Sequence, residues 1–206
     1  MAAIEEVDRV GQAAENPEDE LIRRARRSDP AAWETLVREH QEHVFRLAYL
    51  TLRDAAAAED VAQETFIRAY LALDSFELGR PFRPWLTRIA VNLARNRRRS
   101  IGRYLKHLRR VLLNEPRPVP NSDGLERAMQ ARWRADQLWQ AVRRLSQKKQ
   151  EVIYLRYFLA MPEADMAEAL DVPPGTIKSR LHRALADLRQ VIEVDYSELK
   201  ELFEAE

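Results

Sequence analysis

Polar and cationic side chains occupy one face of the segment 176–190. His182 and Arg183 follow Ser179 by three and four residues, so in a helix all three point away from an apolar stripe. That stripe consists of Ile177, Leu181, Ala184, Leu185 and Leu188. Groups of this kind on an exposed helix face can form hydrogen bonds with base edges in a DNA major groove. A solvated basic helix in a bundle has the same pattern and remains an alternative at this point.

The residues just before this segment predict the element that positions it. Residues 163–170 have the pattern of a short amphipathic helix, and 171–175, which include Gly175, are typical of a tight turn. A short helix, a turn and a longer helix make a helix-turn-helix, whose second helix enters the major groove. Backbone N–H groups near Thr176 would favour a phosphate. Lys178 and Arg180 flank the apolar stripe and add positive charge.

A second concentration of charge lies in the middle of the chain. Residues 95–110 contain eight Lys and Arg residues and no acidic residue. The positive charges of such a run repel one another unless a polyanion binds to them, which indicates a nucleic-acid partner. A charged helix that is merely solvated is the alternative. Just upstream stand Phe76, Phe82 and Trp85, and aromatic rings beside cations can stack on unpaired bases. We expect Trp85 to be mostly core, whereas Phe76 suits either role.

An acidic group of side chains precedes this basic run. Glu59, Asp60 and Glu64 lie within two helical turns, next to Gln63. An acidic face in a chain that binds DNA indicates a protein partner, and a solvated face that balances charge is the alternative.

Several classes of protein are excluded by residue types. The chain has no Cys, which excludes disulfides, thiolate metal sites and cysteine nucleophiles. His40 and His43 share a helix face, but no nearby carboxylate completes a metal site. No phosphate-binding glycine loop or triad motif is present. We therefore expect no catalytic residue, no metal and no cofactor. The acidic N-terminus and the lack of a long apolar run predict a cytoplasmic protein without membrane insertion.

The net charge of +1 conceals an uneven distribution. Residues 23–110 carry a net charge of +9 and residues 111–190 carry +3, whereas residues 1–22 carry −6 and residues 191–206 carry −5. A basic body between acidic ends is common among proteins that bind polyanions.

The elements that must carry these groups are helices. Residues 31–78 and 125–161 contain neither Gly nor Pro and are rich in helix formers, so we expect an all-α fold of two small helical domains. Prolines at alternate positions predict an extended linker at 114–124. The predicted division is an acidic segment 1–19, a first domain 20–113, the linker 114–124, a helix-turn-helix domain 125–192 and an acidic tail 193–206. The predicted helices lie at 21–27, after Pro30, around 61–73, at 84–113, 125–144, 147–159, 163–170 and 174–192.

Four blocks of the sequence follow one another within residues 20–192. They are Ala32-Trp33-Glu34-Thr35-Leu36-Val37, residues 58–70 with Asp60-Val61-Ala62-Gln63-Glu64, residues 82–92 from Phe82-Arg83-Pro84-Trp85 to Asn92, and residues 172–184. In this order the blocks resemble bacterial sigma factors of the sigma-70 family, in particular the extracytoplasmic-function (ECF) group. Pro162 departs from the family, which usually has a helix-starting residue such as Ser there, so we expect a shifted helix start.

The resemblance implies a function and partners. Residues 20–113 correspond to sigma region 2 and residues 125–192 to region 4. Such a protein is not an enzyme: it binds core RNA polymerase and directs it to promoters. The second block, with Asp60, Gln63 and Glu64, would dock on the clamp helices of the polymerase. An anti-sigma factor is a further possible partner, and the linker would thread toward the active-site region of the polymerase.

The resemblance also implies two DNA sites. The C-terminal helix would read the minus-thirty-five element of duplex promoter DNA through Thr176, Lys178, Ser179, Arg180, His182 and Arg183. The first domain would melt the minus-ten element and capture a flipped base of the single-stranded non-template strand. Ala72, Phe76 and Asn92 would line that pocket beside the variable loop 77–82, with Arg95, Arg98 and Arg99 on the DNA backbone.

Two rival interpretations remain from the residues alone. A two-part transcription regulator would bind duplex DNA with its C-terminal motif and sense a signal or dimerise with its N-terminal helices. A helical scaffold would carry its basic faces incidentally. Blocks 58–70 and 82–92 favour the sigma factor, because a sensor domain does not need them.

Overall fold

The computed structural model of the protein describes residues 16–108 and 136–196. Both stretches are built from helices and neither contains a β-strand, which confirms the all-α fold. Within these stretches, no helix is long and apolar enough to cross a membrane. The linker predicted at 114–124 lies outside the described residues.

The first stretch forms four α-helices and one short turn of 3-10 helix. They are α1 (Pro17–Arg26), α2 (Pro30–Leu52), α3 (Ala55–Leu71), the 3-10 turn Leu73–Ser75 and α4 (Phe82–Leu108). Side chains of Asn16, Asp29 and Asp54 cap the first three helices by accepting backbone N–H groups. α1 begins four residues before its predicted start, because Asn16 supplies a cap and Pro17 suits the first helical turn.

The second stretch contains the predicted helix-turn-helix. Residues 136–144 are helical and are followed by α6 (Gln147–Ile153), a π-helical turn at Tyr154–Phe158, α7 (Glu163–Leu170) and α8 (Pro174–Asp195). α7 has the predicted bounds, with Pro162 at its N-cap position, so the expected shift of its start was wrong. α8 ends three residues later than expected.

Asp171, rather than Gly175, makes the sharp change of direction in the helix-turn-helix. Asp171 has a left-handed backbone with φ of 56°, a conformation that Asp tolerates better than most residues. The next helix then begins at Pro174, which places Gly175 inside its first turn. Gly175 therefore has no special backbone role, contrary to the sequence prediction of a glycine in the turn.

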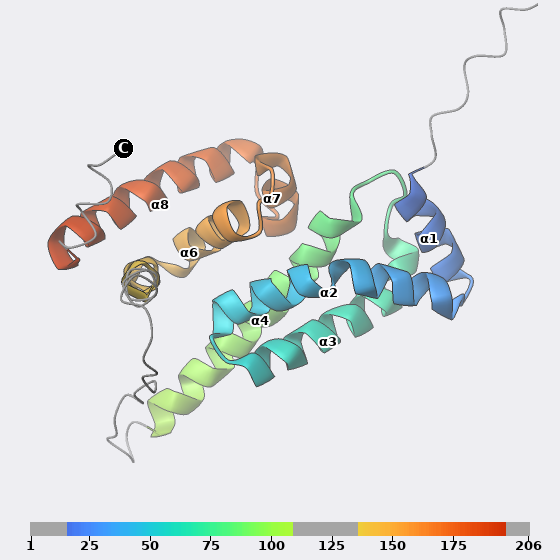
Figure 1. Ribbon diagram of the computed structural model, residues 1–206, viewed down its shortest axis with the longest axis horizontal. Helices are drawn as coiled ribbons and strands as arrows, with labels where there is room; N and C mark the ends of the chain where they lie inside the picture. Colours follow the sequence, from blue (N-terminus) through green and yellow to red (C-terminus); the bar gives the residue numbers. More distant parts are fainter. Residues whose placement is uncertain (1–15, 109–135, 197–206) are drawn as a thin grey trace, which may run out of the picture.

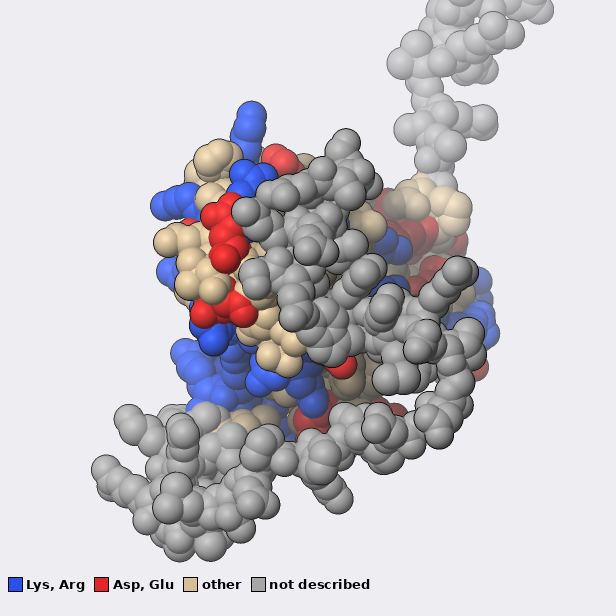
Figure 2. Space-filling model, turned by 60° about the vertical axis from the view of Figure 1, so that its left-hand side comes forward, with Lys and Arg blue, Asp and Glu red and all other residues tan. Residues whose placement is uncertain are grey.

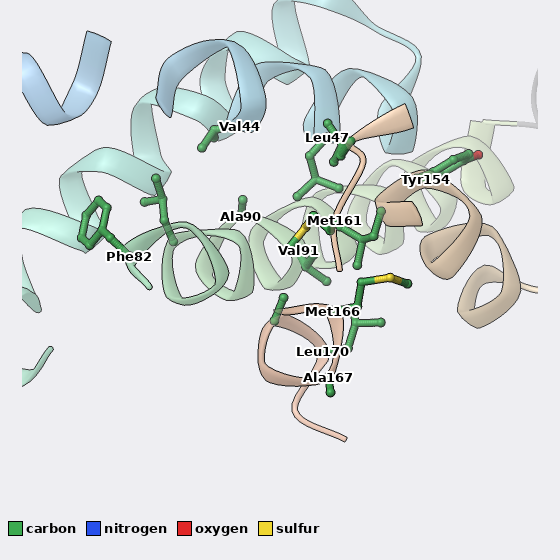
Figure 3. Close-up of a cluster of buried hydrophobic side chains, with 14 of the residues drawn as sticks. Val44, Leu47, Phe82, Ala90, Val91, Tyr154, Met161, Met166, Ala167 and Leu170 are labelled. Atoms are coloured by element: carbon green, nitrogen blue, oxygen red, sulfur yellow. The ribbon is translucent and has the colours of Figure 1, made fainter. Parts of the chain in front are cut away.

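The two stretches pack against each other along α4. In Figure 1, α6, α7 and α8 lie on one side of α4, α1 and α3 lie on the other, and α2 crosses α4. Figure 3 shows Val44 and Leu47 of α2 facing α4 from one side and Met166 of α7 facing it from the other. One buried apolar cluster includes side chains of both stretches. The predicted domains are therefore joined by a shared core that their separate sequence patterns did not indicate.

Candidate nucleic-acid and protein interfaces

The polar face of α8 is exposed and continuous. Ser179, His182 and Arg183 all lie at the surface, whereas Ile177 and Ala184 on the opposite face are fully buried. The predicted direction of these side chains is thereby confirmed. One member of the predicted apolar stripe, Leu185, is 42% exposed, because the helix packs on only one side and Leu185 lies at the margin of the contact.

Arg183 is held along the axis of α8 before any DNA is bound. Its Nε donates a hydrogen bond to the carbonyl oxygen of Ser179 at 3.1 Å, and its Nη2 lies 3.3 Å from Ser179 Oγ. Lys178 is exposed, and Arg180 is partly buried. The Thr176 N–H already donates to the carbonyl oxygen of Pro173 at 2.9 Å, so the helix start offers fewer free donors for a phosphate than the sequence suggested.

Acidic and amide groups from other elements contact the arginines of α4. Nε and Nη2 of Arg95 donate to the two carboxylate oxygens of Glu151, at 2.7 and 2.6 Å. Nη1 of Arg98 donates to Gln150 at 2.9 Å, and Nη2 of Arg97 donates to Asp60 at 3.0 Å. The run has no acidic neighbour in sequence, but in the part of the chain that the structure describes the fold supplies Glu151 and Asp60.

Glu151 is the more buried of the two acidic partners. Its side chain is 5% exposed, against 27% for Arg95, and Gln147 Nε2 donates a further hydrogen bond to it at 3.0 Å. The hydrogen bond with Glu151 raises the pKa of Arg95. The sequence did not indicate this role of Glu151, whose only signal is its place just before the apolar Val152 and Ile153 of α6.

Two further cations bridge the two stretches. The guanidinium of Arg53, which ends α2, lies 3.7 Å from the centroid of the Trp139 ring. Nη2 of Arg88 on α4 lies 2.7 Å from the carboxylate of Asp171, in the turn of the helix-turn-helix. Figure 2 shows a face of the molecule on which Lys and Arg side chains gather, with Asp and Glu side chains beside them. Part of the positive charge is therefore paired with acidic or aromatic side chains of the protein itself.

Phe76 belongs to a buried aromatic cluster. Its side chain is 4% exposed, and its ring lies 5.4 Å from Phe82 and 5.2 Å from Trp85, centroid to centroid. Ala72, at the C-cap of α3, is partly buried, and Asn92 is exposed on α4. Trp85 is only partly buried but packs on the main core, in line with its predicted role.

Side chains of α1 contact the segment between α3 and α4. Nε of Arg26 donates to the carbonyl oxygen of Leu73 at 3.1 Å, and its Nη2 donates to that of Phe76. The carboxylate of Asp19 accepts the N–H of Gly79. These contacts had no sequence signal beyond the acidic character of residues 1–22.

The acidic face of α3 adjoins exposed apolar side chains. Asp60 and Gln63 are exposed, and Glu64 is partly exposed and pairs with Arg68 at 2.6 Å. On the following turns Ile67 is 56% exposed and Leu71 is 78% exposed. Tyr70 is also 43% exposed, and its ring lies 5.1 Å from that of Trp33, centroid to centroid. Exposed apolar side chains rimmed by charge are typical of protein-docking surfaces.

The two histidines of α2 have structural partners. His40 Nε2 lies 3.0 Å from Glu18, and His43 Nε2 lies 2.9 Å from the hydroxyl of Thr87. Burial lowers the pKa of His43 to about 4. The described residues hold no cluster of His and carboxylate side chains suited to a metal ion.

Comparisons with known proteins agree on one family. Residues 36–111 match the family model of sigma-70 region 2, and residues 135–188 match that of sigma-70 region 4. The chain is 33% identical to the ECF RNA polymerase sigma factor SigW of Bacillus subtilis, over 82% of this chain and 93% of SigW. It is 31% identical to the RNA polymerase sigma-H factor of Pseudomonas aeruginosa, over 81% of this chain and 89% of that protein.

Solved structures extend this similarity to the fold. CnrH, solved in complex with the cytosolic domain of CnrY, has a TM-score of 0.65 and 25% identity, and the match covers 87% of this chain and 99% of CnrH. The sigma factor RpoE of Bartonella quintana, solved in complex with the anti-sigma factor NepR, has a TM-score of 0.58 and 26% identity, over 79% of this chain and 97% of that one.

Proposed function

The chain belongs to the ECF group of sigma factors in the sigma-70 family, and from this membership we propose which helices carry each step of promoter recognition. A sigma factor is an initiation factor and not an enzyme. It binds core RNA polymerase and directs promoter-specific transcription, reading the minus-thirty-five element with its helix-turn-helix and reading and melting the minus-ten element with its N-terminal helices. A sigma factor acts on DNA in the cytoplasm.

α8 is the helix that reads the minus-thirty-five element. The observation that carries this assignment is its exposed polar face, which follows directly on the turn at Asp171. Ser179, His182 and Arg183 contact base edges, where a bidentate arginine prefers guanine. Lys178 and Arg180 contact phosphates, which position the helix without reading sequence. Thr176 adds a polar group at the end of the helix that enters the groove.

The minus-ten element binds at the segment between α3 and α4. Ala72, Phe76 and Asn92 line the pocket for a flipped base, and extrusion of that base costs a few kcal/mol that pocket contacts offset. Arg95, Arg98 and Arg99 contact the backbone of the non-template strand. For Phe76 to stack on a base, its ring must leave the contact with Phe82 and Trp85 or receive the base at its edge.

Binding of the minus-ten strand competes with the packing of the two stretches. Arg95 and Arg98 are bound to Glu151 and Gln150 in the structure, so these arginines reach phosphates only when α6 moves away from α4. The packed arrangement of the two stretches is accordingly that of the free protein. Polymerase binding separates the first stretch from the second. An anti-sigma factor is a further partner, as supported by the complex of the similar sigma factor of Bartonella quintana with its anti-sigma factor.

α3 is the helix that docks on the clamp helices of the polymerase. Asp60, Gln63 and Glu64 supply its charged and polar part, and the exposed side chains of Ile67 and Leu71 supply an apolar part. Such a combination of an apolar centre and a polar rim is usual for protein interfaces.

Run-off transcription with purified core polymerase tests the proposed function. The full-length chain is added to core enzyme and to a promoter library randomised at both elements, and the transcribed templates are sequenced. We expect enrichment of two sequence elements that depends on the chain. Enrichment of neither element over core enzyme alone would refute the assignment. The variant Arg183→Ala, with exposed Arg189→Ala as a control, then links the upstream element to α8.

A further inference from the structure

Arg26 of α1 fixes the first part of the segment that joins α3 to α4. Its guanidinium donates to two backbone carbonyl oxygens, those of Leu73 and Phe76, three residues apart. A guanidinium that binds two carbonyls restricts the turn between them more than one hydrogen bond does, because its donors have a fixed geometry. Phe76 is the proposed stacking residue of the minus-ten pocket.

Two carboxylates of α1 fix the rest of this segment. Both oxygens of Asp19 accept the N–H of Gly79, at 3.1 and 3.0 Å. One oxygen of Glu18 accepts the N–H of Phe82 at 3.3 Å, and the other lies 3.0 Å from His40. The hydrogen bond with His40 lowers the pKa of Glu18, so this carboxylate is charged. The start, middle and end of the segment are each tied to α1.

The side chains of α1 form these hydrogen bonds with backbone groups of the loop and not with its side chains. Gly79 has a φ of 86°, a left-handed conformation suited to glycine, and its N–H points at a carboxylate that is only 7% exposed. A buried carboxylate is costly unless it is hydrogen-bonded, so Asp19 strongly favours the loop conformation that supplies this donor. These contacts therefore depend on the backbone of the loop, including the left-handed Gly79, and not on its side chains.

We propose that Asp19, Glu18 and Arg26 are positioning residues for recognition of the minus-ten base. This inference rests on the proposed function of the segment between α3 and α4. α1 holds the backbone of that segment in the shape that accepts the flipped base, so the cost of ordering the loop is not added to DNA binding. Loss of these contacts weakens discrimination between matched and mismatched bases, even when the domain stays folded.

The test measures discrimination at the minus-ten element in the complete holoenzyme. A promoter selected with wild-type protein is compared with the same promoter carrying a substituted minus-ten base, and the ratio of run-off rates is the readout. We expect Asp19→Ala to lower this ratio by about tenfold, the lower end of what the loss of hydrogen bonds to a charged acceptor implies. Asp19→Asn keeps one acceptor oxygen and is expected to restore part of the ratio.

A matched core variant separates positioning from folding. Ile22→Val removes one buried methyl group from α1, and Ile22 takes no part in the hydrogen bonds to the loop. It is expected to lower Tm while the minus-ten ratio stays at the wild-type value. If Asp19→Ala lowers Tm but leaves the ratio unchanged, the positioning role is refuted; should Asp19→Ala not fold, an unchanged ratio in Asp19→Asn and Arg26→Gln refutes it equally. A wild-type holoenzyme that ignores the minus-ten substitution instead overturns the proposed function itself.

Discussion

Replacement of Arg95 by Ala removes the only cation that the structure places on the buried Glu151 carboxylate among the described residues. The Glu151 side chain is 5% exposed and keeps one hydrogen bond, from Gln147 at 3.0 Å. Breaking a buried ion pair from one side costs about 3–5 kcal/mol when the remaining charge cannot reach water. Here the charge can reach water, because α6 can move away from α4. We therefore expect Arg95→Ala to shift the equilibrium between packed and separated regions by about 2–3 kcal/mol toward separation.

Glu151→Gln is expected to have a smaller effect than Arg95→Ala. Arg95 is 27% exposed and can turn its charge toward solvent, and a glutamine oxygen still accepts one of its hydrogen bonds. We expect a shift of about 1 kcal/mol. The double variant should be less separated than Arg95→Ala alone, since it leaves no uncompensated buried charge.

The absence of cysteine makes this equilibrium easy to measure. Dyes are attached to cysteines introduced at the exposed residues Glu39 on α2 and Arg189 on α8, and energy transfer reports the distance between the two stretches. The exposed pair Arg97 and Asp60, both within the first stretch, provides a control, because Arg97→Ala should leave energy transfer unchanged. If Arg95→Ala and the double variant separate equally, the explanation by a buried unpaired carboxylate is refuted.

Three further predictions concern DNA, polymerase and pH. Arg183→Ala should weaken binding of the upstream promoter element in the holoenzyme by about 1–3 kcal/mol, and equal affinity in a mobility-shift titration would contradict base contact. The double variant Asp60→Arg with Glu64→Arg should lose core-polymerase binding, and unchanged co-elution would refute docking through α3. The lowered pKa of His43, about 4, means that the unfolded chain takes up a proton first as pH falls. The neutral, buried imidazole therefore adds its full contribution to the free energy of unfolding above the ordinary pKa near 6.5. As the pH falls from 6.5 to 4, up to about 3 kcal/mol of that contribution is lost. Urea unfolding of wild type and His43→Gln at several pH values measures this loss, and identical pH profiles would disprove it.

Local signals account for the features that sequence analysis predicted correctly. The helix-turn-helix at α7 and α8 follows from apolar spacing of three and four residues and from the turn-forming residues 171–175 between the helices, all within about 30 residues. The exposed direction of Ser179, His182 and Arg183 follows from the same helical period. The start of α1 was missed because the cap of a short helix is a single side chain, Asn16, inside a polar segment.

Contacts between residues far apart in the sequence could not be predicted without the tertiary structure. Glu151 lies 56 residues after Arg95, and Asp19 lies 60 residues before Gly79. No helical period relates such positions, and their side chains meet only because apolar faces of α1, α2, α4 and α7 pack into one core. The sequence by itself determined the helices, their polar faces and the family. Tertiary packing alone decided which arginines are already paired, that Phe76 is buried and that α1 holds the loop, because these depend on where whole helices lie and not on the order of neighbouring residues.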